Sequence, residues 1–205
     1  TISSIYFEMG KLYDLVGDSD SAMQHIREGN RVQADSFEAG KFAGNTYLNE
    51  TRNIYNQINH DWLKSWTDLS LEKEANSIVF LLGFPRSGTT LLDQILDGHP
   101  KIQVIEEKPM IENIVEQLAE FPGTYPSSLA SLNSDDIDLL RKEYMGGLDR
   151  YVDREAGSII VDKLPLNIVH VGLICRLFPN SKIILALRHP ADVCLSNFMQ
   201  HYKIN

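Results

Sequence analysis

The stretch 83-GFPRSGTT-90 decides how this chain folds. The apolar run 77–82 comes directly before it, and the run 91–96, which favours a helix, follows it. That order predicts a strand, a glycine-bounded loop and a helix. Such a loop turns backbone N–H groups inward, and the helix behind it adds the positive end of its dipole. The stretch therefore predicts an anion site of phosphate or sulfate size.

The side chains of this loop indicate which anion it binds. Arg86 supplies a cation, and Thr89 and Thr90 supply hydroxyl groups. A Walker A loop, G-x-x-x-x-G-K-[ST], places a lysine directly after its second glycine. Gly83 and Gly88 have the Walker spacing, but Thr89 stands where the lysine is required. The sequence therefore disfavours a nucleoside triphosphate with its metal and favours a smaller anion that needs no metal.

A second strand leads into another cation. Residues 181–187 have the pattern of a buried strand, and Arg188 follows them directly. Pro190 favours the first turn of a new helix, which places Ser196 about two turns into that helix. Because a guanidinium group binds phosphate through a fixed fork of donors, Arg188 is a candidate for a second phosphate position.

The order of strands and helices predicts an α/β fold. We expect strands at 78–83, near 102–105, at 158–162 and at 182–187, with helices at 88–98, near 109–120, near 135–151, about 166–178 and from 190. This alternation is typical of a parallel sheet covered by helices on both faces, and such sheets bind ligands beyond the carboxyl ends of their strands. Arg86, Lys163 and Arg188 each follow a strand, so we expect the three cations to converge there. Residues 121–135 hold Pro, Gly and Ser and predict a surface loop.

The motifs resemble those of sulfotransferases that use 3′-phosphoadenosine 5′-phosphosulfate (PAPS). The 5′-phosphosulfate loop of these enzymes reads [KR]-S-G-T-T, as residues 86–90 do. In that family an arginine at a strand end and a serine eight positions later bind the 3′-phosphate, and Arg188 and Ser196 match them. The run 97-DGHP-100 followed by Glu106-Glu107 is similar to that of tyrosylprotein sulfotransferases. The resemblance covers about 78–205, and the whole chain looks most like bacterial tetratricopeptide-repeat sulfotransferases.

This resemblance implies a sulfotransferase fold, a P-loop-type parallel sheet flanked by helices, here truncated at its C-terminus. It implies PAPS as co-substrate without a metal, and an acceptor hydroxyl on a peptide tyrosine, a glycan or a small metabolite. The residues implied to bind PAPS are Arg86, Ser87, Gly88, Thr89, Thr90, Arg188 and Ser196. Because the chain stops at Asn205, we expect it to bind PAPS poorly on its own.

The resemblance also implies catalytic roles. Glu107 matches the general base, and Lys163 and Arg86 match cations that stabilise the transferring and leaving oxygens. Glu106 is the second choice of base, and His99 is a weaker one. Since adjacent side chains of an extended segment point apart, we expect only one of the two glutamates to face the site.

Residues 1–72 predict a separate helical region before a sulfotransferase domain at 73–205. The first helices have the spacing of one tetratricopeptide-like unit, which we expect to offer a surface for a protein partner. The residues with this spacing are Phe7, Met9, Gly10, Tyr13, Gly17, Ala22, Ile26 and Gly29. The stretch 31–67 predicts linking helices that pack on the catalytic domain.

Composition limits the other possibilities. The 205 residues carry a formal net charge of −9, which argues against a protein that binds nucleic acid mainly through phosphates. No apolar run reaches the ~18–20 residues of a membrane span, and the two cysteines fit neither a zinc site nor a disulfide framework. We expect a cytoplasmic protein. The alternatives that remain are a P-loop nucleotide kinase and a non-catalytic interaction protein.

Overall fold

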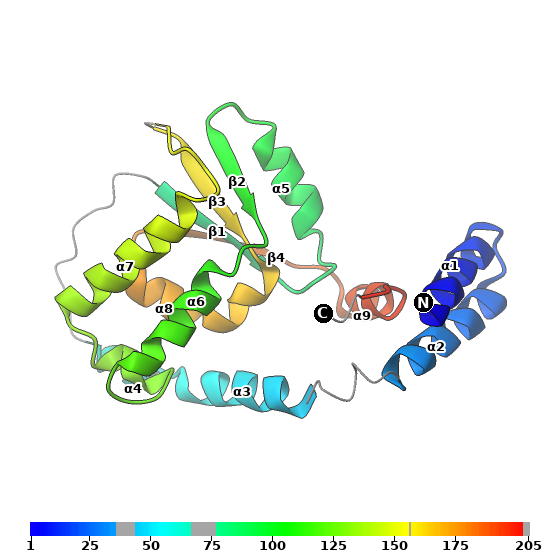
Figure 1. Cartoon of the computed structure of the whole chain (residues 1–205), viewed down its shortest axis with the longest axis horizontal. Helices are drawn as coiled ribbons and strands as arrows, with labels where there is room; N and C mark the ends of the chain where they lie inside the picture. Colours follow the sequence, from blue (N-terminus) through cyan, green and yellow to red (C-terminus); the bar gives the residue numbers. More distant parts are fainter. Residues whose placement is uncertain (36–43, 67–76, 156, 203–205) are drawn as a thin grey trace. The chain divides into compact units, whose positions relative to one another are not determined.

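Four parallel strands form the sheet in the computed structural model, which describes residues 1–35, 44–66, 77–155 and 157–202. The strands are β1 (Ser77–Gly83), β2 (Ile102–Glu106), β3 (Ile159–Lys163) and β4 (Lys182–Ala186) (Figure 1). Their order across the sheet is β2-β3-β1-β4. All neighbours pair in parallel, so the four carboxyl ends lie at one edge of the sheet. The predicted parallel sheet is confirmed.

By its contacts the chain divides into two compact units, residues 49–187 and residues 1–48 with 188–205. The first of these, the sheet unit, contains all four strands. The second, the helical unit, contains the N-terminal helices and the last helix. The predicted boundary at 72/73 lies outside the described residues.

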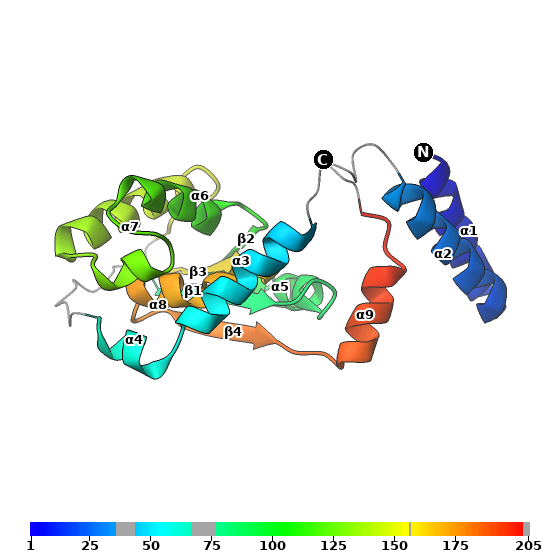
Figure 2. The same ribbon diagram turned by 90° about the horizontal axis from the view of Figure 1, so that it is seen from below.

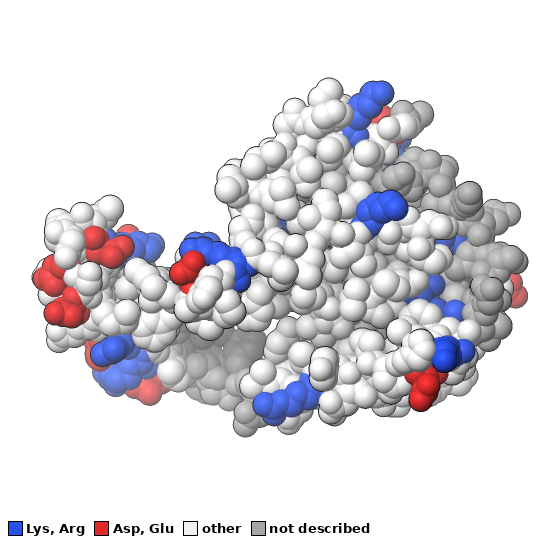
Figure 3. All heavy atoms as spheres, turned by 180° about the vertical axis from the view of Figure 1, so that it is seen from behind, with Lys and Arg blue, Asp and Glu red and all other residues white. Residues whose placement is uncertain are grey.

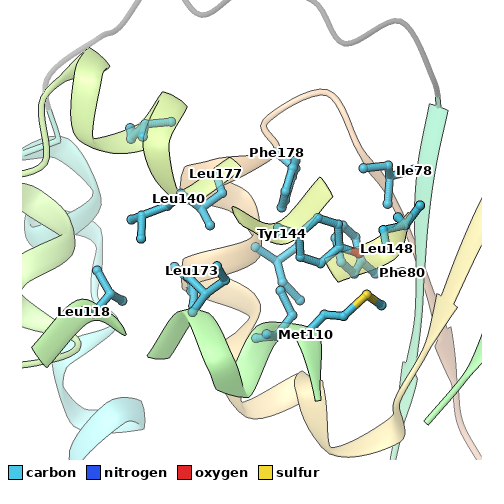
Figure 4. Close-up of a cluster of buried hydrophobic side chains, with 14 of the residues drawn as sticks. Ile78, Phe80, Met110, Leu118, Leu140, Tyr144, Leu148, Leu173, Leu177 and Phe178 are labelled. Carbon is cyan, nitrogen blue, oxygen red and sulfur yellow. The ribbon is translucent and has the colours of Figure 1, made fainter. Parts of the chain in front are cut away.

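One face of the sheet packs an apolar core. The helices α6 (Met110–Gln117), α7 (Ser134–Leu148) and α8 (Val171–Leu177) contribute to this core together with alternate residues of β1. Figure 4 shows Phe80 of β1 close to Tyr144 and Phe178, whose rings lie with centroids 4.8 Å apart. Each large side chain buried in this way contributes ~1.5–3 kcal/mol to stability.

The other face of the sheet is in contact with α5 (Thr89–Asp97), which touches β1, β2 and β3. Its buried residues are polar, namely Thr89 and Asp93. Leu91 and Ile95 of the same helix are exposed. The side of α5 that faces the sheet therefore contains two buried polar residues beside the half-buried Leu92 and Leu96.

The segment 121–135, predicted to be a surface loop, is exposed at many positions, but part of it enters the core. It contains a short 3-10 helix, Ser127–Ala130, and both Leu129 and Leu132 are buried in the core. Buried Arg176 of α8 donates hydrogen bonds to the carbonyl oxygens of Leu129 (3.1 Å) and Leu132 (2.9 Å). Because a guanidinium group satisfies these carbonyls, the segment can enter the core with only one short 3-10 helix.

Two predicted helices begin or end as 3-10 helix. The helix predicted near 109–120 is α6 followed by a 3-10 turn over Leu118–Glu120. The helix predicted at about 166–178 starts as a 3-10 helix over Pro165–His170 and continues as α8. Before the sheet, α3 (Gly44–Gln57) and α4 (His60–Lys64) lead toward the core, and Trp62 packs against it.

The helical unit contains an antiparallel hairpin of α1 (Ile2–Leu15) and α2 (Ser19–Ala34) (Figure 2). Small residues allow its close packing, since a Cβ on Gly10 would lie 2.5 Å from Cγ1 of Ile26. In the same unit, α9 (Pro190–Phe198) is joined to α2 because the Asn30 side chain donates a hydrogen bond to the Phe198 carbonyl (2.9 Å).

Within the described residues, no helix is both long and apolar enough to cross a membrane. On the face that Figure 3 shows, Lys and Arg side chains of the described residues form separate spots, several of them beside Asp or Glu.

Candidate active site

The loop between β1 and α5 is shaped to expose backbone donors. Arg86 (φ 72°) and Gly88 (φ 100°) both adopt left-handed conformations. Ser87 closes a turn by donating its N–H to the Phe84 carbonyl oxygen at 3.1 Å. No side chain caps the N-terminus of α5 at Gly88. The cap residue therefore provides no side-chain acceptor for the first N–H groups of the helix, an arrangement that favours an anion at this end.

The interior of this loop is tightly packed and contains an unsatisfied hydroxyl. A Cβ on Gly83 would lie 2.7 Å from Ser87 Oγ and 3.0 Å from the Ala186 carbonyl oxygen, so only glycine fits there. Ser87 Oγ is buried and makes no hydrogen bond to any described residue. Thr89 is also buried, whereas Thr90 and Arg86 are exposed. An anion in the loop would provide the acceptor that Ser87 lacks.

Lys163 lies at the carboxyl end of β3 and is fully buried. Its Nζ donates hydrogen bonds to Glu106 Oε1 (2.8 Å) and Glu107 Oε1 (2.9 Å), and it lies 3.0 Å from Asp93 Oδ2. The ammonium group is thus surrounded by one carboxylate from α5 and two from the end of β2.

These neighbours determine the protonation of Lys163. Burial by itself lowers the pKa of Lys163, because it penalises the charged form. The carboxylates of Glu106, Glu107 and Asp93 together outweigh burial, and they raise the pKa of Lys163 above its ordinary value. The lysine is therefore a permanent cation at neutral pH.

The expectation that only one glutamate faces the site is wrong. Glu106 and Glu107 both contact the same ammonium group. The reason is the backbone of Glu107, whose φ of 49° interrupts the alternation of the strand. Arg86 and Glu107 are the non-glycine residues with positive φ among those described, and both lie at the carboxyl edge of the sheet. Such strained residues concentrate at functional sites.

Asp162 precedes Lys163 but points to the opposite face of the sheet. It is fully buried and accepts a hydrogen bond from the Tyr144 hydroxyl at 2.7 Å. Its other oxygen makes no hydrogen bond to a described residue. Burial raises the pKa of Asp162 to about 7, the Tyr144 hydrogen bond lowers it by a smaller amount, and nearby Glu112 raises it further. Asp162 and Lys163, although adjacent in the sequence, therefore have different partners on opposite faces of the sheet.

The structure thus brings some of the predicted site residues together. Lys163 and Glu107 are in contact, and Arg86 to Thr90 form one loop. Arg188 and Ser196 belong by contacts to the helical unit, in which Arg188 lies 3.8 Å from Asp192. His99 is exposed, and its Nδ1 accepts a hydrogen bond from the Lys101 N–H at 3.2 Å. Within the described residues, no group of three His, Cys, Asp or Glu side chains could hold a metal ion.

Sequence reasoning missed Asp93. A signal was present, because Asp93 lies four residues after Thr89 and so shares its side of the helix. An acidic residue on the side of a helix that faces a sheet needs a buried cation, and Lys163 is that cation.

Comparisons with known proteins agree with this geometry. The sequence pattern of the sulfotransferase family matches residues 78–205. An uncharacterized protein of Aquifex aeolicus (strain VF5) is 36% identical over 132 residues, which cover 60% of this chain and 17% of that protein. Nodulation protein NoeE of Sinorhizobium fredii is 31% identical over 133 residues, 58% of this chain and 30% of its own length.

Human protein-tyrosine sulfotransferase 1 is 28% identical over 116 residues, 54% of this chain and 31% of its own length. The chain therefore spans less than a third of the length of each of these relatives. Because the family pattern covers more than half of the chain and includes the loop 83–90 and the buried lysine, the chain belongs to the sulfotransferase family.

Proposed function

We propose that this protein transfers a sulfuryl group from PAPS to an acceptor hydroxyl. The observation that carries the proposal is the contact between buried Lys163 and Glu107 at the edge of the sheet where the anion loop also ends. A cation and a carboxylate are the two groups that such a transfer needs, one for the leaving oxygen and one for the proton of the acceptor.

The loop 86–90 would hold the 5′-phosphosulfate of the donor. The uncapped N–H groups of α5 and the Ser87 hydroxyl supply neutral donors, and Arg86 supplies a charge. Thr89 and Thr90 add hydroxyl groups, as the resemblance implies. Arg188 and Ser196 are proposed to bind the 3′-phosphate. The donor supplies the activated sulfur–oxygen bond, and the protein positions it.

Lys163 and Glu107 would divide the remaining chemistry. Lys163 keeps its proton and stabilises the negative charge on the oxygen that leaves with the phosphate. Glu107 accepts the proton of the acceptor hydroxyl, and its exposed carboxylate can rotate away from Lys163 to do so. Glu106 also reaches Lys163, so it remains the second candidate for the base.

The helical unit offers a surface for a partner or for the acceptor. An open groove of about 640 Å³ lies on the hairpin of α1 and α2 and is lined by aromatic, apolar and charged side chains, among them Tyr6, Met23, His25 and Arg27. We propose that a protein partner binds this tetratricopeptide-like hairpin. Tyrosine in a peptide, a glycan hydroxyl or a small metabolite is the proposed acceptor, and the cytoplasm is the proposed location.

Calorimetric titration of 3′-phosphoadenosine 5′-phosphate (PAP), the desulfated product, into the full-length protein tests the donor site. We expect binding without a metal, weakened at least tenfold by Arg86→Ala and by Arg188→Ala. Transfer of labelled sulfate from PAPS to tyrosine peptides, oligosaccharides and phenols then identifies the acceptor. Binding of ATP with magnesium in place of PAP would instead support the nucleotide kinase.

A further inference from the structure

Buried Asp93 has no role in the mechanism described so far. It is 4% exposed and lies on α5, the helix whose first residue ends the anion loop. A carboxylate beneath an anion site repels the anion, so its presence there is unfavourable unless a cation compensates for it. Lys163 Nζ, 3.0 Å away, is that cation.

The three carboxylates around Lys163 are not equivalent. The side chains of Glu106 and Glu107 are 62% and 55% exposed and lie at the end of β2, whereas Asp93 is buried and held on a helix. The charged groups that face the Lys163 ammonium are Asp93 of α5 and the two glutamates at the end of β2. Asp162 is not among them, since it points to the other face of the sheet. When Glu107 turns toward an acceptor, Asp93 is the partner that stays in place.

Resting on the proposed function, we propose that Asp93 is a positioning residue, which holds the Lys163 ammonium group at the site while Glu107 leaves it to accept a proton. Asp93 also ties the lysine to the helix that follows the anion loop, so the loop and the cation keep one geometry. Without Asp93, Lys163 would keep only the two exposed glutamates as partners, and its pKa would be lower.

The test compares Asp93→Asn with Asp97→Asn in the full-length protein. Both substitutions remove one carboxylate from α5, but Asp97 is exposed, and the carboxylates that pair with Lys163 are Asp93, Glu106 and Glu107. For Asp93→Asn we expect kcat to fall about tenfold to a hundredfold while the KM for PAPS changes less than threefold. Because the carboxylates raise the pKa of Lys163, the alkaline limb of the kcat profile should move to lower pH in this variant alone.

A second readout does not depend on activity. The NMR resonance of the Lys163 Cε group can be assigned by its absence in Lys163→Arg. It should titrate at lower pH in Asp93→Asn than in the wild type. In Asp97→Asn its titration should be the same as in the wild type. An unchanged titration of Lys163 in Asp93→Asn overturns the positioning role, whatever the enzyme does.

The two proposals fail in different ways. A wild-type protein that neither binds PAP nor transfers sulfate overturns the proposed function, and the lysine titration still decides whether Asp93 sustains the cation. A wild type that transfers sulfate normally, together with an Asp93→Asn variant of unchanged kcat and pH profile, overturns only the positioning role.

Discussion

The two faces of the sheet bury charge in opposite ways, and β3 supplies both examples. Asp162 and Lys163 are neighbours, and both are fully buried. Asp162 enters the apolar core with only the Tyr144 hydroxyl as partner, whereas Lys163 meets three carboxylates on the face covered by α5. The same burial leaves Asp162 with a pKa of about 7 and Lys163 firmly protonated.

This difference shows that partners rather than depth decide whether a buried group stays charged. An unpaired buried ion costs several kcal/mol, and a group avoids that cost by becoming neutral or by finding a counter-ion. On the apolar face, Asp162 can become neutral. On the face covered by α5, Lys163 stays charged because it has counter-ions. A face that keeps a buried cation charged at all working pH values is suited to stabilising negative charge in a reaction.

Replacing the buried cation should have the largest effect. Lys163→Met leaves Asp93 buried without a counter-charge, so we expect the free energy of unfolding to fall by about 3–5 kcal/mol. Sulfuryl transfer should fall at least about a thousandfold, since an oxyanion-stabilising group is lost. Urea denaturation and initial rates measure the two effects. Lys142→Met, at an exposed position of α7, is the control, and equal stability of the two variants would contradict the comparison.

Substitutions of Glu106 and Glu107 test which of these two carboxylates acts as the general base. Glu107→Gln should lower kcat by about 10²–10⁴-fold, because an amide cannot accept the acceptor's proton. Glu106→Gln keeps Glu107 intact and should lower kcat less than about tenfold. Initial rates at saturating PAPS measure both. The reverse order of the two effects would move the role of base to Glu106.

A substitution at Gly83, where the loop after β1 begins, tests whether the face covered by α5 is packed as closely as the apolar one. Gly83→Ala should destabilise the protein by about 1–3 kcal/mol, because the new Cβ would meet Ser87 Oγ and the Ala186 carbonyl. Gly146→Ala is the matched control, since nothing lies within 4 Å of a Cβ there. Within helix α7, that substitution should stabilise by about 0.5–1 kcal/mol. Thermal unfolding of both variants checks the opposite signs.

The smallest effect on activity is expected for Asp162, which pairs with Tyr144 on the apolar face, away from the candidate site. Its folded pKa of about 7 lies above the ordinary value of 3.8, so the folded state binds the extra proton between these values. Stability should therefore fall as pH rises from about 4 to 7, and Asp162→Asn should remove this dependence. At pH 8 we expect the variant to be more stable than the wild type by up to about 4 kcal/mol, because the pKa of Asp162 differs by about 3 between the folded and unfolded states. A pH profile of the melting temperature that is the same in both proteins would contradict the asymmetry of the two faces.

The sequence was sufficient for the features that depend on local pattern. The alternation of apolar runs and glycine-bounded loops predicted the strands and their parallel direction, and residues 83–90 predicted the turn from β1 into α5. Anion binding by this loop stays a prediction. It was not sufficient where side chains from distant segments decide the structure. Arg176 draws 121–135 into the core through two carbonyls, and no local pattern in that segment indicates it.

Asp93 and the two glutamates were missed or misjudged for a related reason. The apolar residues of α5 suggest that Leu91 and Ile95 face inward, yet they are exposed and Asp93 is buried. The contact of both glutamates with Lys163 depends on the positive φ of Glu107, which cannot be predicted from the residue type. The assignments of Arg188 and Ser196 to a phosphate remain predictions.

The backbone of Glu107 donates its N–H to the Lys163 carbonyl oxygen at 2.7 Å, one residue beyond the end of β2. Its amide hydrogen should therefore exchange slowly with solvent, although the side chain of the same residue is exposed. Anchoring the Cα in this way confines the motion of the carboxylate to rotation about its own side-chain bonds. The distance over which a proton can be carried from an acceptor is then fixed by the length of one glutamate side chain.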